Sequence, residues 1–211
     1  MCTTVNKFYL KGFCVFDWNN NEIIKEILEV LQHDEIVLAS SDTILGLFGR
    51  LSQSSKKKLD AIKKRNLKPY IVLIQSVNLL PNFIDQDIDA TMKRIMDIHW
   101  PGPLTILFKA HKNVPDWMVS AQGIIALRVP DHKGLQQLLS NLDGLFTTSA
   151  NISDQPVPNS YKNIDPVILE QVKLVCCQQD FVFDGLASTI LDFSSGSIKV
   201  VRLGSVVVDS I

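Results

Sequence analysis

The sequence predicts an α/β fold, in which helices pack on a sheet. Segments with the apolar spacing of helices alternate along the whole chain with short apolar runs typical of strands. No internal repeat, linker or low-complexity tract interrupts this alternation. The 211 residues are enough to bury a substantial core, and they suit one domain. We therefore expect a single domain over 21–211, preceded at 1–20 by an N-terminal extension whose structure the pattern leaves undefined.

The elements of the first half follow from local spacing. Residues 1–18 are rich in aromatic side chains and fit either a first strand or an extension lying across the core. From Asn21 onward, isoleucines and leucines recur at three and four residues and predict an amphipathic helix. Glu35–Ala39 has the pattern of a short buried strand, and a charged helix with a serine cap is expected over 54–65.

The second half continues the same alternation. A helix over 88–98 must end before Trp100-Pro101-Gly102-Pro103, because these prolines cannot continue it. Further helices are expected at 135–142 and, after a polar loop at 151–160, at 166–177. Strands are expected at 70–74, 104–108, 124–129, 145–148, 189–192 and 198–202.

Composition and charge limit the class of function. Hydrophobic residues make up 46% and charged residues 20% of the chain, which indicates a globular protein rather than a disordered one. The formal net charge is −1, so the chain lacks the overall basic excess of a dedicated nucleic-acid-binding protein, although a local basic patch remains open. No signal peptide is visible and the apolar runs are too short to span a bilayer, so we expect a cytoplasmic protein.

The cysteines and histidines do not predict a metal site. The four cysteines include no CxxC pair, and the adjacent Cys176 and Cys177 have poor geometry for a shared disulfide or a zinc site. The four histidines are scattered without the spacing of metal ligands. We expect buried or free thiols in a reducing compartment, and no metal ligands among the site residues.

Four polar clusters lie at the ends of predicted elements, where α/β proteins bind ligands. Ser40-Ser41-Asp42-Thr43 can hold a ligand through its hydroxyls, or it can simply cap the next turn. The cations over 63–69 fit a polyphosphate clamp, but also the solvated C-terminus of a helix. Thr147–Ser153 offers hydroxyls, an amide and backbone N–H groups to an anion, and Arg128 is an anion contact or an ion-pair partner. Neither a Walker loop nor a GxGxxG motif explains these clusters.

The order of the motifs resembles that of the YrdC/TsaC-like threonylcarbamoyl-adenylate synthase family over about 21–205. The segments concerned are SSDTILGL (40–47), IKKRNLKPY (62–70), WPGPLTILF (100–108), IALRVPDH (125–132), TTSANISDQPVP (147–158), Ser188-Thr189-Ile190 and Arg202-Leu203-Gly204. They are similar, in this order, to P-T-[DE]-T-x-[YF]-G-L, K-x-R-P-x-x-K-P-L, W-P-G-P-x-T, V-x-[VL]-R-x-P-x-H, S-A-N-x-S-G-x-P, S-T-[IV] and R-x-G. Seven short motifs in the same order are strong evidence together.

Several positions depart from the family pattern. Ser40 and Ser41 replace Pro-Thr, Asn66 replaces a proline, Tyr70 a leucine and Asp154 a glycine. These changes leave open a paralogue with altered substrate use.

The resemblance implies a fold and a set of site residues. The fold would be an open, twisted, mixed parallel and antiparallel sheet flanked by helices, with a concave basic cleft. The single-domain form is expected, without the C-terminal domain of longer members. The catalytic tetrad would be Lys63, Arg65, Ser149 and Asn151. The residues that contact substrate or ATP would be Thr43, Lys68, Arg128, Thr147, Ser153, Thr189 and Arg202.

The resemblance also implies the reaction. The protein would be a nucleotidyltransferase that forms L-threonylcarbamoyl-adenylate and pyrophosphate from L-threonine, bicarbonate and ATP, with Mg²⁺ on the phosphates. Its product would pass to a tRNA-modifying transferase that makes N6-threonylcarbamoyladenosine, with weak tRNA binding and no membrane contact. Lys63 and Arg65 would neutralise phosphate and carboxylate charge, Ser149 and Asn151 would bond the carbamate or α-phosphate, and Thr43 would contact threonine.

Three alternatives stay open at this point. The first is a non-catalytic RNA-binding paralogue on the same fold, since a fold does not fix a function. The second is a carbamoyl-transfer module like those inside hydrogenase-maturation proteins. The third is a small nucleotide-binding domain with unrelated chemistry.

Overall fold

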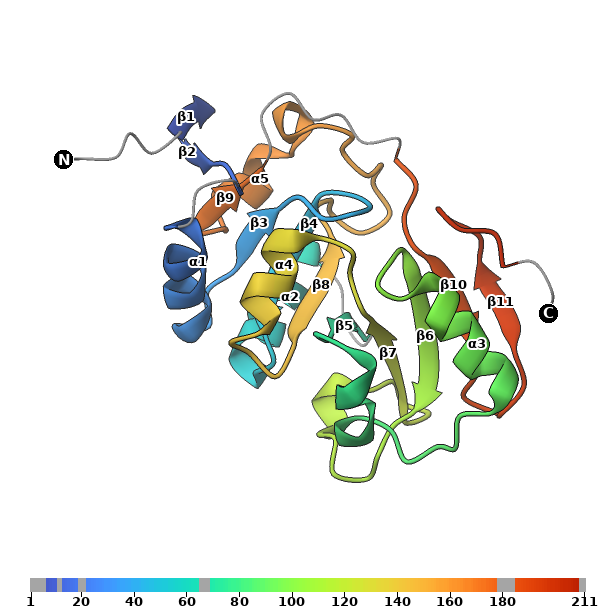
Figure 1. Ribbon diagram of the computed structural model, residues 1–211. Helices are drawn as coiled ribbons and strands as arrows, with labels where there is room; N and C mark the ends of the chain where they lie inside the picture. Colours follow the sequence, from blue (N-terminus) through green and yellow to red (C-terminus); the bar gives the residue numbers. More distant parts are fainter. Residues whose placement is uncertain (1–6, 11–12, 19–21, 65–68, 178–184, 209–211) are drawn as a thin grey trace. The chain divides into compact units, whose positions relative to one another are not determined.

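The computed structural model describes residues 7–10, 13–18, 22–64, 69–177 and 185–208, and it divides the chain into two compact units (Figure 1). Unit 1 consists of Met1–Asn66 and Phe146–Gly185. Unit 2 consists of Leu67–Leu145 and Leu186–Ile211. Each unit carries a mixed parallel and antiparallel sheet with helices, so the predicted α/β class is confirmed. The single domain over 21–211 stays a prediction.

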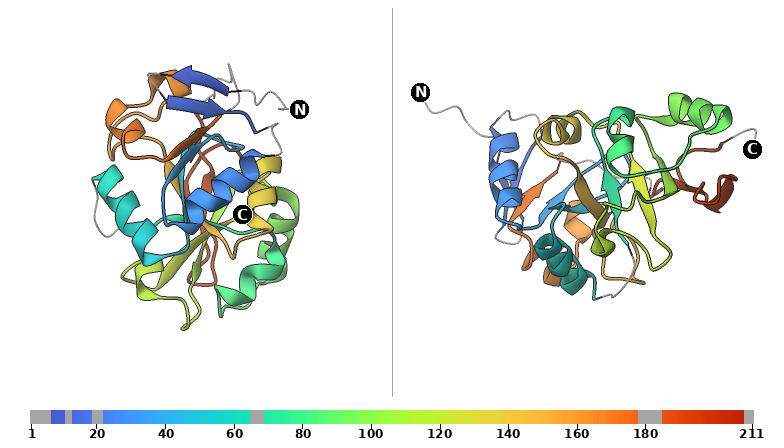
Figure 2. Two further views of the ribbon diagram at one scale, coloured as in Figure 1. Left: turned by 90° about the vertical axis from the view of Figure 1, so that its left-hand side faces the viewer. Right: turned by 90° about the horizontal axis from the view of Figure 1, so that it is seen from below.

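The sheet of unit 1 brings together strands that are far apart in sequence. Its strand order is β1 (Lys7–Leu10), β2 (Phe13–Phe16), β9 (Leu174–Cys176), β3 (Val37–Ala39), β4 (Gly46–Arg50) and β8 (Leu145–Ser149, of which Leu145 belongs to unit 2). β9 runs parallel to both β2 and β3, whereas β1–β2 and β3–β4 are antiparallel pairs. Figure 2 shows the β1–β2 ribbon beside β9. The aromatic segment near the N-terminus therefore forms the first strands, one of the two possibilities left open above.

Unit 2 is built around a second run of strands. Its order is β5 (Ile71–Leu73), β7 (Ile124–Arg128), β6 (Leu104–Lys109), β10 (Thr189–Asp192) and β11 (Lys199–Arg202). β5–β7 and β6–β10 are parallel pairs, and β7–β6 and β10–β11 are antiparallel pairs. The helical elements of this unit are η1 (Val77–Asn82), α3 (Ala90–His99), η2 (Asp116–Met118) and α4 (Lys133–Leu139).

The first two helices of unit 1 form where the sequence pattern predicts them. In α1 (Ile23–Gln32), the buried residues Ile23, Ile27 and Leu31 lie on one face, and the helix packs on β3 and β4. α2 (Gln53–Lys63) begins where the hydroxyl of Ser52 accepts a hydrogen bond from the backbone N–H of Ser55. It ends at Lys64, whose left-handed backbone (φ 50°) stops the helix.

The helix predicted over 166–177 is wrong beyond Leu169. Only Pro166–Leu169 is helical (α5), after the short η3 (Tyr161–Asn163), and the chain then becomes strand β9. All three residues of β9 are buried, and the strand pairs with β2 on one side and β3 on the other. A short apolar run that is buried on both faces lacks the period-two alternation of an ordinary strand, so spacing alone does not separate it from a helix.

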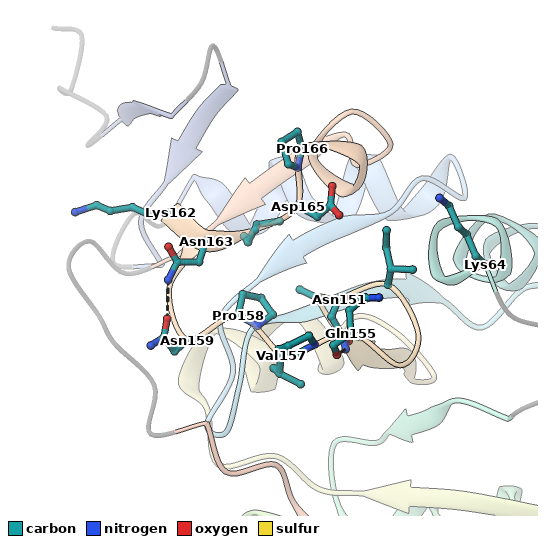
Figure 3. A pocket seen from close by; sticks show the side chains of 14 residues that line it. Lys64, Asn151, Gln155, Val157, Pro158, Asn159, Lys162, Asn163, Asp165 and Pro166 are labelled. Atoms are coloured by element: carbon teal, nitrogen blue, oxygen red, sulfur yellow. Dashed lines mark hydrogen bonds between the residues drawn. The ribbon is translucent and has the colours of Figure 1, made fainter.

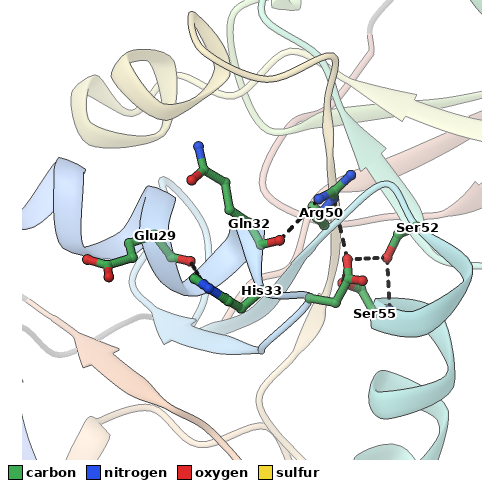
Figure 4. A network of polar contacts seen from close by, with 7 residues as sticks. Glu29, Gln32, His33, Arg50, Ser52 and Ser55 are labelled. Atoms are coloured by element: carbon green, nitrogen blue, oxygen red, sulfur yellow. Dashed lines mark hydrogen bonds and ion pairs between the residues drawn. The ribbon is translucent and has the colours of Figure 1, made fainter.

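A polar network joins the C-terminal end of α1 to the N-terminal end of α2 (Figure 4). Asp34 has a left-handed backbone (φ 59°), and its Oδ1 accepts hydrogen bonds from the hydroxyls of Ser52 (2.7 Å) and Ser55 (3.5 Å). Arg50 forms an ion pair with Asp34 (3.4 Å) and donates to the carbonyl of Gln32 (3.2 Å). The network therefore fixes the cap of α2 relative to α1.

We expect Asp34→Ala to lower the free energy of unfolding by about 1–3 kcal/mol, because it removes the acceptor of two hydroxyls and strains a left-handed position. Asp34→Asn should cost less, about 0.5–1 kcal/mol, since asparagine keeps an acceptor and tolerates this backbone. Urea unfolding of the two variants measures the difference. Equal losses would show that the charge of the carboxylate, rather than the acceptor, carries the effect.

Candidate functional site

The side chain of Lys63 is the centre of a hydrogen-bonded cluster in unit 1. Lys63 is the last residue of α2 and only 2% of it is exposed. Its Nζ donates to the carbonyl oxygens of Ser149 (2.8 Å) and Asn151, to Oδ1 of Asn151 (2.7 Å) and, more weakly, to Oγ of Ser149 (3.4 Å). These four oxygens are uncharged, and they hold the Lys63 ammonium in place. A buried cation in such surroundings favours an anion nearby.

Ser149 and Asn151 are also bonded to each other. The hydroxyl of Ser149 donates to Oδ1 of Asn151 (2.6 Å), and Nδ2 of Asn151 donates to the carbonyl of Gln155. The backbone N–H of Ser153 returns to the carbonyl of Lys63 (3.2 Å). Three of the four predicted tetrad residues therefore lie in one cluster, although 86 residues separate Lys63 from Ser149. The fourth, Arg65, and the predicted contact Lys68 lie outside the described residues.

The loop that contains Thr43 lies next to this cluster. Ala150 lies between Ser149 and Asn151 in the sequence. Its backbone N–H donates to the carbonyl of Leu45 (2.9 Å). Ser41 organises the loop, because its hydroxyl accepts from the N–H of Thr43 (3.2 Å) and of Ile44 (3.3 Å). Thr43 is 7% exposed, and its Oγ1 lies 3.1 Å from the hydroxyl of Ser41.

The remaining predicted residues of unit 1 have clear local environments. Thr147 faces Gly46, where an added Cβ would lie 3.2 Å from the threonine hydroxyl and 2.9 Å from the ring of Phe48. The glycine thus allows β4 and β8 to approach closely. Oγ of Ser153 is buried and has no hydrogen-bond partner among the described residues. Asp154 has φ 66°, so this position, a glycine in the family pattern, keeps its left-handed backbone with one of the few other residues that tolerate it.

A pocket of about 930 Å³ opens beside the cluster, and all of its lining comes from unit 1 (Figure 3). Its walls are rich in side-chain amides, from Asn151, Gln155, Asn159 and Asn163. Figure 3 shows Lys64 and Lys162 on opposite sides of it. A cavity lined by several amides, two exposed lysines and the carboxylate of Asp165 suits a polar ligand.

Unit 2 contains a second group of predicted residues. Arg128 is 4% exposed, and its Nε donates to the carbonyl of Gly102 (3.0 Å). Arg202 donates to the carbonyl of Ser188 through Nε (3.1 Å) and Nη2 (2.8 Å). Burial of its guanidinium, with the like charge of Arg128 as a second cause, lowers the pKa of Arg202. An anion bound near both guanidinium groups would relieve this repulsion.

The backbone around these arginines explains two of the motifs. In the W-P-G-P motif, the N–H of Gly102 donates to the carbonyl of Val129 (2.8 Å). The carbonyl of Gly102 accepts the hydrogen bond from Nε of Arg128. In R-x-G, a Cβ on Gly204 would lie 2.1 Å from the carbonyl oxygen of Ala187. Thr189 is buried, and its hydroxyl accepts from the N–H of Gly204 (3.0 Å), so this predicted ligand contact has a structural partner.

Sequence reasoning missed two polar contributors. The carbonyl of Ser188 accepts a hydrogen bond from the guanidinium of Arg202. The hydroxyl of Ser188 lies 2.8 Å from that of Thr105. Its position in the S-T-[IV] motif was the available signal. Trp18 donates its indole N–H to the hydroxyl of Ser40 (2.9 Å), and no motif pointed to it.

Two expectations about other groups can be compared with the structure. Cys176 and Cys177 are free and buried, as expected, and burial raises the pKa of both thiols, that of Cys177 to about 12. Within the described part of the chain, no three His, Cys, Asp or Glu side chains gather as metal ligands. No helix of the same residues is long and apolar enough to cross a membrane.

The family suggested by the order of the motifs agrees with a match between this chain and a protein-family model. Residues 29–204 match the model of the Sua5/YciO/YrdC family, described as "Telomere recombination". A putative threonylcarbamoyl-AMP synthase of Methanocaldococcus jannaschii is 30% identical over 88% of this chain and 89% of its own length. A threonylcarbamoyl-AMP synthase of Buchnera aphidicola is 33% identical over 65% of this chain and 74% of its own.

Solved structures share the fold at low identity. E. coli YciO superposes with a TM-score of 0.78 at 19% identity, over 90% of this chain and 93% of that one. Sua5 of P. abyssi superposes with a TM-score of 0.75 at 24% identity, over 86% of this chain and 56% of that one. Both support an open mixed sheet of the YrdC type.

Proposed function

The chain belongs to the Sua5/YciO/YrdC family, and from this premise we propose that it is a threonylcarbamoyl-AMP synthase. The amine of L-threonine attacks the carbon of bicarbonate, and loss of water gives a carbamate. A carbamate oxygen then attacks the α-phosphorus of ATP, and the bond to the β-phosphate oxygen breaks to release pyrophosphate. The named relatives support this reaction, because one of them matches over most of both chains.

The Lys63–Ser149–Asn151 cluster is the observation that carries the proposal. The reaction accumulates negative charge on carboxylate and phosphate oxygens, and preformed dipoles and cations stabilise that charge most strongly when burial excludes water. The Lys63 ammonium has three donors, and four oxygens of the loop lie within hydrogen-bond distance of its Nζ. We assign Lys63 two tasks, to fix the loop and to supply positive potential there.

The other predicted residues complete the proposed mechanism. Ser149 and Asn151 would hydrogen-bond the carbamate or the α-phosphate, with Arg65 and Lys68 contributing charge. Thr43 would contact threonine. Thr147 and Ser153 belong to the same segment as Ser149 and Asn151 and would line the binding site with them. Arg128, Thr189 and Arg202 in unit 2 would bind anionic substrate groups, and the concave basic cleft stays part of this proposal.

Magnesium enters the proposal only through ATP. The described residues offer no cluster of three carboxylate, imidazole or thiolate groups that would hold the ion by themselves. The ion would bind the phosphate oxygens of ATP and reduce their charge when ATP binds. Delivery of the adenylate to a tRNA-modifying transferase, weak tRNA binding and a cytoplasmic location are further expectations of the same proposal.

Pyrophosphate release by the purified protein tests the reaction. With ATP, Mg²⁺, bicarbonate and L-threonine, release should require both threonine and bicarbonate. ATP binding without release, together with RNA affinity that falls steeply with salt, would instead support the non-catalytic RNA-binding paralogue.

We expect Ser149→Ala to lower kcat by about 10²-fold, because the hydroxyl contacts both Lys63 and Asn151. Ser153→Ala should have a much smaller effect, since the Ser153 hydroxyl has no partner among the described residues and its backbone bond to Lys63 survives. Steady-state pyrophosphate release compares the two serines within one loop. Equal losses would show that the loop acts only through its fold.

A further inference from the structure

The segment before α1 reaches the loop that contains Thr43. β2, β9 and β3 are adjacent and parallel, so their carboxyl ends lie at the same edge of the sheet of unit 1. The ladder continues past these ends, since the N–H of Cys177 donates to the carbonyl of Phe16 (2.9 Å) and that of Ser40 to the carbonyl of Cys176 (3.0 Å). The residues that follow β2 and β3 are therefore fixed relative to each other.

One side chain joins the outer two of these strands directly. β2 and β3 are two interstrand spacings apart, about 9–10 Å. The indole of Trp18, the longest rigid side chain available, crosses this distance and donates its N–H to Oγ of Ser40 (2.9 Å). Ser40 is 3% exposed, so this bond is shielded from competing water.

Ser40 is also the start of the loop that holds Thr43. The next residue, Ser41, accepts the N–H groups of Thr43 and Ile44 and donates to the carbonyl of Ile44 (2.8 Å). Hydrogen bonds thus hold Ser40 through Trp18 and hold Thr43 through Ser41, and the peptide bond between Ser40 and Ser41 joins the two sets. At the far end of the loop, Leu45 accepts from Ala150 beside the tetrad.

We propose that Trp18 is a positioning residue for threonine, which acts by holding Ser40 and hence the 40–45 loop in its binding geometry. This inference rests on the proposed function, in which Thr43 contacts threonine. It gives the N-terminal segment a role in substrate binding that no motif of the sequence indicated. The fixed loop lowers the conformational entropy that threonine binding would otherwise have to remove.

Two variants separate the hydrogen bond from the bulk of the side chains. Trp18→Phe keeps an aromatic ring but loses the donor, and Ser40→Ala loses the acceptor while its N–H to Cys176 survives. Each should raise KM for threonine about three- to tenfold, the effect of one hydrogen bond, with kcat and KM for ATP nearly unchanged. The double variant should be no worse than either single one, because both remove the same bond. Ser40→Thr should restore the wild-type KM.

Trp117→Phe, the same change in η2 of unit 2, is the matched control and should leave KM for threonine unchanged. Additive effects of Trp18→Phe and Ser40→Ala, or equal losses in kcat, would overturn the proposal. Amide hydrogen exchange tests the Trp18–Ser40 hydrogen bond without reference to catalysis, since Trp18→Phe should accelerate exchange over 40–45 and not over 151–155. Unchanged exchange over 40–45 would refute the positioning of the loop by the Trp18–Ser40 hydrogen bond. Faster exchange in a protein that releases no pyrophosphate would instead refute the synthase proposal and, with it, the role of Trp18 in threonine binding.

Discussion

Lys63→Ala is expected to lower kcat/KM for adenylate formation by at least about 10²–10³-fold. The change removes a buried positive charge and four contacts with the Ser149–Asn151 loop. Both the potential at the loop and its geometry should therefore be lost. Pyrophosphate release at varied ATP and threonine concentrations measures the effect.

Two further variants make the Lys63 result interpretable. Lys63→Met keeps most of the side-chain volume, and an apolar replacement of a buried charge often leaves stability intact, so it should be as inactive as Lys63→Ala but fully folded. Lys57→Ala, at an exposed position of the same helix, should be near wild type. Near-normal rates in folded Lys63→Met would remove Lys63 from the proposed machinery.

Asn151→Asp is expected to abolish catalysis while the protein remains folded. The new carboxylate would lie 2.7 Å from the Lys63 ammonium, in the position of Oδ1, and would pair with it. It would also place negative charge where the carbamate and α-phosphate are proposed to bind. Two like charges about 4 Å apart at an effective dielectric constant near 20 repel by about 4 kcal/mol, which corresponds to about 10³-fold in rate or affinity.

The Asn151 variant has a simple control. Asn141→Asp adds the same charge at an exposed position of unit 2 and should leave the kinetics unchanged. Chemical denaturation and ATP titration of both variants separate folding from ligand binding. A folded Asn151→Asp protein with wild-type turnover would mean that the substrate anions bind elsewhere.

The sequence predicted elements best where one face of a helix or strand is apolar. The helix from Ile23 to Gln32 follows directly from its leucine and isoleucine spacing, and the break at Trp100–Pro103 follows from proline chemistry. Leu174–Cys176 was mistaken for helix because it is a short, fully buried apolar run, and its strand partners β2 and β3 lie far away in sequence. Such tertiary context is not available to local patterns.

For the candidate site, the sequence supplied the residues but not their partners. The motif order identified Lys63, Ser149 and Asn151, and the structure brings these three together. The direction of the Lys63 ammonium, toward the loop that carries the other two, could not be read from spacing. The support of Arg128 by the carbonyl of Gly102 was likewise hidden, because 26 residues separate them.

The transfer of carbon from bicarbonate into an adenylate tests the account most directly. The purified protein would be incubated with ¹⁴C-bicarbonate, L-threonine, ATP and Mg²⁺, and the nucleotides separated at once by chromatography. We expect a labelled species that contains AMP and threonine, forms in step with pyrophosphate and is absent with Lys63→Met. Pyrophosphate release without label in any adenylate, or no release from folded wild-type protein, would contradict it.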